Sequence, residues 1–143
     1  MIALILSGVT AFPVQTELHW LLGHPALVPA FAQNWLQNVY AALVETNNKY
    51  PMLAYGFDWL AFAHIVIAMA FIGPLKDPVK NKWIIDWAIL ACFAVFPLAF
   101  ICGPIRQIPM FHILIDCTFG IIGLIPLFIC RNWIKKLENK TQY

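Results

Sequence analysis

Long apolar runs separated by short polar segments dominate this chain. Three of them cover about residues 55–72, 83–101 and 108–130, and each is close to the roughly 20 residues that an α-helix needs to cross a bilayer. The first two end near Gly-Pro pairs, at Gly73-Pro74 and Gly103-Pro104, where a helix readily stops. The pattern therefore predicts three transmembrane helices.

A further apolar run opens the chain and reaches Pro13 after only a dozen residues. Because a membrane helix can absorb a proline as a kink, we expect one helix over about residues 1–22, which gives a fourth span with Glu17 and His19 near water. The alternative is a bundle of three spans, in which this segment is a signal anchor or an interfacial helix.

Between residues 29 and 47 the apolar positions recur at helical spacing in an amide-rich segment. We expect an amphipathic helix that starts after Pro29 and ends at the pair Asn47 and Asn48, on the outer side of the membrane. Its polar face carries almost no Lys or Arg, so a lid packed on the bundle is favoured over a helix that binds anionic lipid.

Composition supports a membrane class, since 62% of the 143 residues are hydrophobic and 11% are charged. About a quarter of the residues in a soluble domain are charged. The expected fold is an all-α integral membrane bundle with one domain over residues 1–143 and the lipid bilayer as its surroundings. A net charge of +2, dispersed along the chain, does not form the basic patch of a nucleic-acid-binding protein.

Basic residues mark the expected orientation, because loops rich in Lys and Arg stay in the cytoplasm. They gather in the loop after residue 72 and in the segment after residue 130, so both segments and the C-terminus are expected on the cytoplasmic side. These residues are Lys76, Lys80, Lys82, Arg131, Lys135, Lys136 and Lys140.

Ionisable residues inside apolar runs are costly and tend to face protein or water, so they are the candidate site. At about 100° per residue, Asp58 and His64 share a face with small residues, and His112 and Asp116 share another with two glycines. We expect these two faces to pack together. His64 and Asp116 would then interact at similar depth, with Asp58 and His112 as an outer pair.

Three interpretations of these residues are open. The first is polar contact between helices with no further role. The second is a ligand set. His64, His112 and Asp116 are weak candidates for a divalent metal, because HxxxH and ExxH spacings are absent. The two histidines differ in expected depth by about 7–9 Å, which disfavours a bis-histidine haem. The third is proton handling by Asp58, His64 and Asp116.

Other charged residues and the cysteines have structural interpretations. Arg106, in a short outer loop, is expected to pair with Asp58 or with an anionic headgroup. Lys82 and Asp86 lie about one helical turn apart and are expected to form a structural ion pair. The four cysteines show no CxxC spacing and are expected to be apolar packing residues.

The segments LSGVTAFPVQTEL, YGFDWLAFAHIVIA and ICGPIRQIPMFHILIDCTFG resemble a family of uncharacterised small polytopic membrane proteins from bacteria. The resemblance covers residues 6 to about 130. It implies a multi-pass protein of the bacterial inner membrane and brings no activity, cofactor or catalytic residue.

The expected function is that of a non-catalytic accessory or assembly partner, as a homo-oligomer or in a larger membrane complex. A membrane-embedded enzyme, or a metal or haem binder built around His64 and Asp116, is the alternative, and a small proton-coupled transporter is the third hypothesis. The sequence names no substrate, catalytic residue or cofactor.

Overall fold

The computed structural model describes residues 1–141 of the chain and shows helices joined by short turns, with no strand among those residues. The chain divides into two compact units, unit 1 over Met1–Ala70 and unit 2 over Phe71–Tyr143. Each unit is built on a closely packed pair of helices. An all-helical fold is therefore confirmed, and the single-domain organisation stays a prediction.

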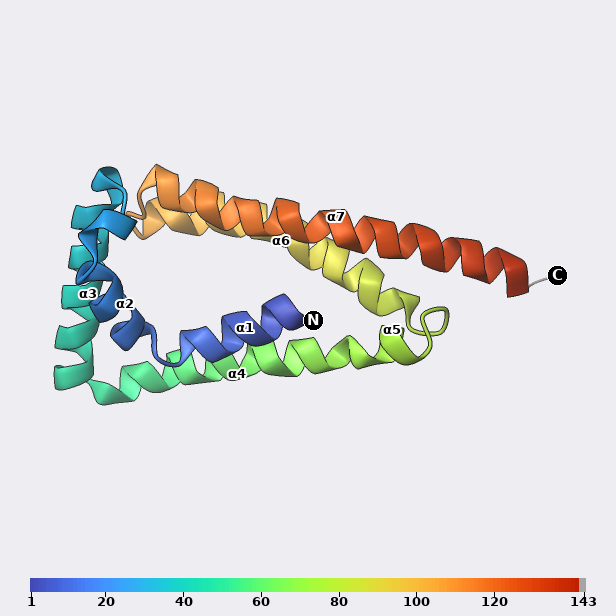
Figure 1. Ribbon diagram of the computed structural model, residues 1–143, viewed down its shortest axis with the longest axis horizontal. Coiled ribbons are helices and arrows are strands. Elements are labelled where there is room, and N and C mark those ends of the chain that lie inside the picture. The colour runs from blue at the N-terminus through green and yellow to red at the C-terminus, as the bar shows by residue number, and fades with distance from the viewer. Residues whose placement is uncertain (142–143) are drawn as a thin grey trace. The chain divides into compact units, whose positions relative to one another are not determined.

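Unit 1 contains two helix pairs (Figure 1). The first pairs α1 (Ile2–Ala11) with α4 (Ala54–Ala70), which run in opposite directions. The second pairs α2 (Val14–Leu22) with α3 (Ala30–Lys49). One-turn 3₁₀ helices at Pro25–Leu27 and Pro51–Leu53 connect α2 to α3 and α3 to α4.

The helix expected over residues 1–22 is broken at Pro13, so the prediction of one kinked helix is wrong. Pro13 has a backbone conformation (φ −90°, ψ 28°) outside the helical range and precedes the first residue of α2. The proline ring has no N–H to donate and clashes with the preceding turn. Because α1 has ten residues and a length of about 15 Å, it is too short to cross about 30 Å of hydrocarbon.

Close contact between α1 and α4 depends on Gly8, which is buried. A Cβ atom added there would lie 2.8 Å from the carbonyl oxygen of Ala61 and 2.8 Å from Cγ1 of Ile65. Ala61 and Ala68 are almost completely buried on the facing side of α4. The small residues therefore let the two backbones approach closely, as in other membrane helix pairs.

Unit 2 is built on α6 (Lys82–Ile105) and α7 (Met110–Thr141), which run antiparallel (Figure 1). The short α5 (Ile72–Lys76) packs against α6. A small apolar core forms where the two long helices meet away from their connecting turn. Its buried members are Ile85, Ile89 and Ile134.

The turn between α6 and α7 is a tight helix cap. Gln107 has a positive φ of 57°, its N–H donates to the Pro104 carbonyl, and the Ile108 N–H donates to the Gly103 carbonyl at 2.9 Å. These two bonds define a Schellman motif, in which glycine is the usual residue at the left-handed position. The motif reverses the chain and sets α7 against α6.

Three segments are long and apolar enough to cross a membrane: Pro51–Lys76, Lys82–Ile105 and Met110–Lys140. The predicted end of the third helix near residue 101 is too early, because α6 continues through Pro97 and past Gly103. The last helix likewise extends beyond residue 130. The fourth span is not confirmed, and the helix expected over residues 29–47 is present, with its outer location still a prediction.

The glycine contact gives a direct test of the α1–α4 pair. Gly8→Ala should destabilise the folded protein by roughly 1–3 kcal/mol, because the new methyl group meets a backbone oxygen that cannot move aside. Thermal unfolding of the detergent-purified protein, followed by circular dichroism, measures the effect.

Gly56→Ala is the matched control, since a Cβ at Gly56 in α4 has no atom within 4 Å. It should leave stability unchanged or raise it by up to about 1 kcal/mol through better helix propensity. Equal effects of the two substitutions would contradict the packing of Gly8 on α4.

Candidate functional site

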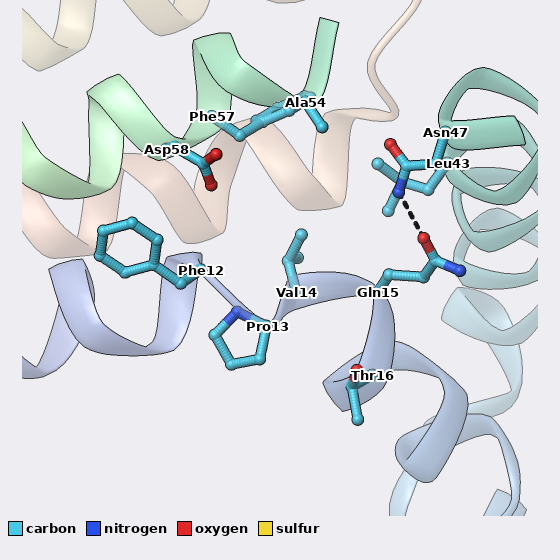
Figure 2. A pocket seen from close by; sticks show the side chains of 10 residues that line it. All are labelled: Phe12, Pro13, Val14, Gln15, Thr16, Leu43, Asn47, Ala54, Phe57 and Asp58. Atoms are coloured by element: carbon cyan, nitrogen blue, oxygen red, sulfur yellow. Dashed lines mark hydrogen bonds between the residues drawn. The ribbon is translucent and has the colours of Figure 1, made fainter. Parts of the chain in front are cut away.

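Unit 1 contains a cavity of about 320 Å³ at the break between α1 and α2 (Figure 2). The break forms one wall, and the end of α3 and the start of α4 form the others. Apolar and polar side chains share the lining. It consists of Phe12, Pro13, Val14, Gln15, Thr16, Leu43, Asn47, Ala54, Phe57 and Asp58.

Asp58 is the one charged side chain in this lining. Figure 2 shows its carboxylate directed toward the space next to Phe12 and Val14. The residue is half-buried, and within residues 1–70 it forms no hydrogen bond or ion pair. A carboxylate without a partner in a candidate span is costly, so this group calls for a positive charge or a hydrogen-bond donor.

Two polar contacts join α2 to α3 beside and beyond the cavity. The Asn47 side-chain amide donates a hydrogen bond to the Gln15 side-chain oxygen (Figure 2). Farther along, Nδ1 of His19 and the Tyr40 hydroxyl lie 3.1 Å apart. Sequence reasoning did not identify these pairs, because the amides look like ordinary surface residues until the break at Pro13 turns α2 toward α3.

His64 lies on the α4 face that contacts α1, with its Cβ 3.3 Å from the position that a Gly8 Cβ would take. Its Nδ1 donates to the Leu60 carbonyl oxygen at 2.8 Å, which leaves Nε2 as the acceptor in the neutral ring. The imidazole is thus hydrogen-bonded to the backbone of its own helix. The proposed contact of His64 with Asp116 would join the two units and stays a prediction.

His112 and Asp116 are neighbours on α7, with 3.9 Å between Nε2 and Oδ1. Their i, i+4 spacing on one helix brings them together without any tertiary contact. Both side chains are about two-fifths exposed. The expected outer pair of Asp58 with His112, and that of Asp58 with Arg106, would also join the two units and are untested.

Each of the two small-residue faces contacts a helix of its own unit, and the expected packing of the two faces on each other stays a prediction. In unit 2 a Cβ on Gly120 would lie 3.0 Å from the Cys92 carbonyl oxygen, and one on Gly123 would lie 3.0 Å from the Cys92 Sγ. The glycines of α7 therefore pack on α6, while the alanine face of α4 packs on α1.

The predicted Lys82–Asp86 ion pair is wrong, because each residue has a partner on α7. Nζ of Lys82 lies 2.8 Å from Oε2 of Glu138, and Nε of Arg131 lies 2.5 Å from Oδ1 of Asp86. A lysine before an acid at i, i+4 is the weaker order on a helix. The antiparallel neighbour offers both side chains a better partner.

The described residues bring together no set of metal ligands, and the haem hypothesis stays untested. Within residues 1–141 no group of three or more His, Cys, Asp or Glu side chains could hold a metal ion. All four cysteines in this part of the chain are free, and Cys117 is buried as a packing residue.

Comparison with known proteins adds no family: no family model, curated protein or solved structure matches the chain. The Asp58 cavity is therefore the candidate functional site on its geometry alone.

The new α6–α7 ion pair can be measured with a double-mutant cycle. Asp86→Asn and Arg131→Gln should show a coupling free energy of roughly 1 kcal/mol, because the pair is only partly exposed and its hydrogen bond is charge-assisted. Thermal unfolding of the single and double variants in detergent gives the value. A cycle between Lys82 and Asp86 should give no coupling.

Asp77 and Lys80 form the matched control pair, in the loop between α5 and α6. The Lys80 backbone N–H donates to Asp77 and holds the pKa of that carboxyl below its usual range. The Lys80 side chain is 84% exposed, so the cycle for this pair should give a coupling near zero. A larger coupling here than for Asp86 and Arg131 would contradict the assignment.

Proposed function

We propose that this chain is a non-catalytic accessory protein of the bacterial inner membrane, which works by assembling with further membrane helices. The bacterial setting rests on the resemblance of its sequence to small polytopic proteins. The assembly role rests on how little of its apolar surface each unit buries.

The observation that carries this proposal is the exposure of the candidate spans. In the most apolar 18-residue stretch of each span, only 11%, 11% and 17% of the residues are buried. A pair of helices has a single interface, so most of each helix surface needs a cover of lipid or of other helices.

One face of α4 is well suited to helix contact. Trp59, Phe62, Val66 and Met69 recur on one side of the helix and are 41–57% exposed. We call these four residues the α4 stripe. Trp59 and Phe62 stack edge to face with ring centroids 6.0 Å apart. Close packing is what drives helix association in lipid, and aromatic residues and Met are enriched at protein interfaces.

We predict that the protein does not behave as an isolated monomer. Solubilised in a mild detergent, it should have a protein mass of two or more copies, or copurify stoichiometrically with another membrane protein. Light scattering combined with refractive index and absorbance separates protein mass from detergent mass. A monomer free of other proteins over a wide concentration range would contradict the proposal.

A matched pair of variants tests whether the α4 stripe is the contact. Phe62→Ala with Met69→Ala should shift the assembly toward the monomer, because the packing surface is truncated. Leu60→Ala is the control, since Leu60 is 59% exposed on another face of the same helix. Dissociation by both changes would indicate general destabilisation of α4.

Orientation gives an independent prediction. Reporters placed between Asp77 and Asn81, or fused after Lys140, should be cytoplasmic, whereas one at Asn47 should be periplasmic, because basic loops remain inside. Lys82 and Arg131 are paired with acids on neighbouring helices, but acidic residues contribute little to this rule. A periplasmic signal after Lys140 would overturn the orientation.

A further inference from the structure

We infer that the Asp58 cavity is a binding site for a small organic ammonium ion, with Asp58 as its counter-ion. This site goes beyond the assembly role, because it assigns a soluble ligand to unit 1. The inference rests on the charge, the free acceptors and the apolar walls of one cavity, all within residues 1–70.

The cavity lining has a formal charge of −1, from Asp58 alone. The nearest lysine in the sequence to this lining is Lys49, two residues after Asn47, and its Nζ lies over the Tyr50 ring at 5.5 Å from the centroid. That ammonium group is engaged outside the lining. The lining thus presents a carboxylate without a cation of its own.

The start of α2 explains how the fold tolerates this carboxylate. Val14, Gln15 and Thr16 form the first turn of α2 and line the cavity, and the amide N–H groups of a first turn have no acceptor within the helix. They give this wall a partial positive charge of about one half. Half a charge eases the burial of Asp58 but does not neutralise it, so the cavity still attracts a cation.

Neutral acceptors accompany the carboxylate. Because the Asn47 amide nitrogen donates to Gln15, the Asn47 side-chain oxygen remains available to accept. Gln15 and Thr16 also belong to the lining. An ammonium group carries up to three N–H donors, so one bound at the Asp58 carboxylate keeps donors for a neutral acceptor or for water.

The remaining walls select an organic cation over a metal ion. Phe12, Val14, Leu43 and Phe57 contribute apolar surface, and aromatic rings attract cations through their negative faces. A hard metal ion would need six or more oxygen ligands, whereas this lining offers one carboxylate and a few neutral oxygens beside its apolar side chains. The volume of about 320 Å³ lies at the lower end of ligand pockets, which fits a small molecule.

The cavity also lies where a solute from water can reach it. Asp58 is seven residues from the start of the candidate span Pro51–Lys76, a distance of about 10 Å along a helix. An ammonium ion therefore does not need to enter the centre of the bilayer.

Calorimetric titration of the full chain in detergent tests the inference with three probes: benzylammonium, its neutral analogue benzyl alcohol, and sodium ion. Benzylammonium should bind at least tenfold more tightly than either of the others. Asp58→Asn should weaken benzylammonium binding at least tenfold. Glu45→Gln, a charge-removing control at an exposed α3 position outside the lining, should leave it unchanged.

A second variant keeps the test decisive if Asp58→Asn fails to fold. Ala54→Leu fills the cavity while keeping the carboxylate, and it should abolish benzylammonium binding with the helical circular dichroism retained. Equal affinity for benzylammonium and benzyl alcohol, or unchanged binding in Asp58→Asn, would overturn the site. A wild type that does not bind benzylammonium, together with an Arg106→Gln variant that does, would also overturn the site. Asp58 would then be paired with an arginine of its own chain.

Discussion

Close approach of helix backbones at glycine is the constraint on which both units depend. In lipid no difference in hydrophobicity drives helices together, so association comes from dispersion contacts and polar bonds. A Cβ on Gly8 would lie 2.8 Å from the backbone of α4, which leaves no room for it, and one on Gly120 would lie 3.0 Å from the backbone of α6, which is a tight contact. Gly103 is equally confined, because a Cβ there would lie 2.6 Å from Cδ1 of Ile113.

Ion pairs connect α6 and α7 at the end of the helix pair opposite their connecting turn. There the helices are in contact through charged side chains and not through glycines. Arg131 with Asp86 and Lys82 with Glu138 connect the helices at two successive levels. The Schellman turn at Gln107 sets the opposite end. The register between α6 and α7 is therefore determined at both ends, and the apolar cluster of Ile85, Ile89 and Ile134 fills the space next to the ion pairs.

The Asp58 cavity follows from the same geometry in unit 1. Gly8 holds α1 against α4, and Pro13 ends α1 before it has covered the first turn of α4. The chain then turns away as α2, held to α3 by Gln15 with Asn47. An acid on α4 is left beside a helix start and an opening of about 320 Å³. A packing contact and a helix break together create the candidate site.

The sequence by itself determined that this protein is helical and apolar enough for a membrane, because run length and composition are local properties that need no partner. It also located the α3 helix to within two residues at each end. It identified Asp58, His64, His112 and Asp116 as candidate residues of a polar site. It could not decide which helix each polar face meets. Periodicity shows that Asp58 and His64 share a face, but the same pattern permits any neighbour.

Only the tertiary structure decided the partners. It set Gly8 of α1 against the small-residue face of α4, and it paired Asp86 with Arg131 instead of Lys82, because the antiparallel helix α7 presents a complementary charge at the right height. It also showed Pro13 as a break instead of a kink, which depends on whether α2 gains more by packing on α3 than by continuing α1. Such choices compare contacts between distant segments, and no local pattern contains that comparison.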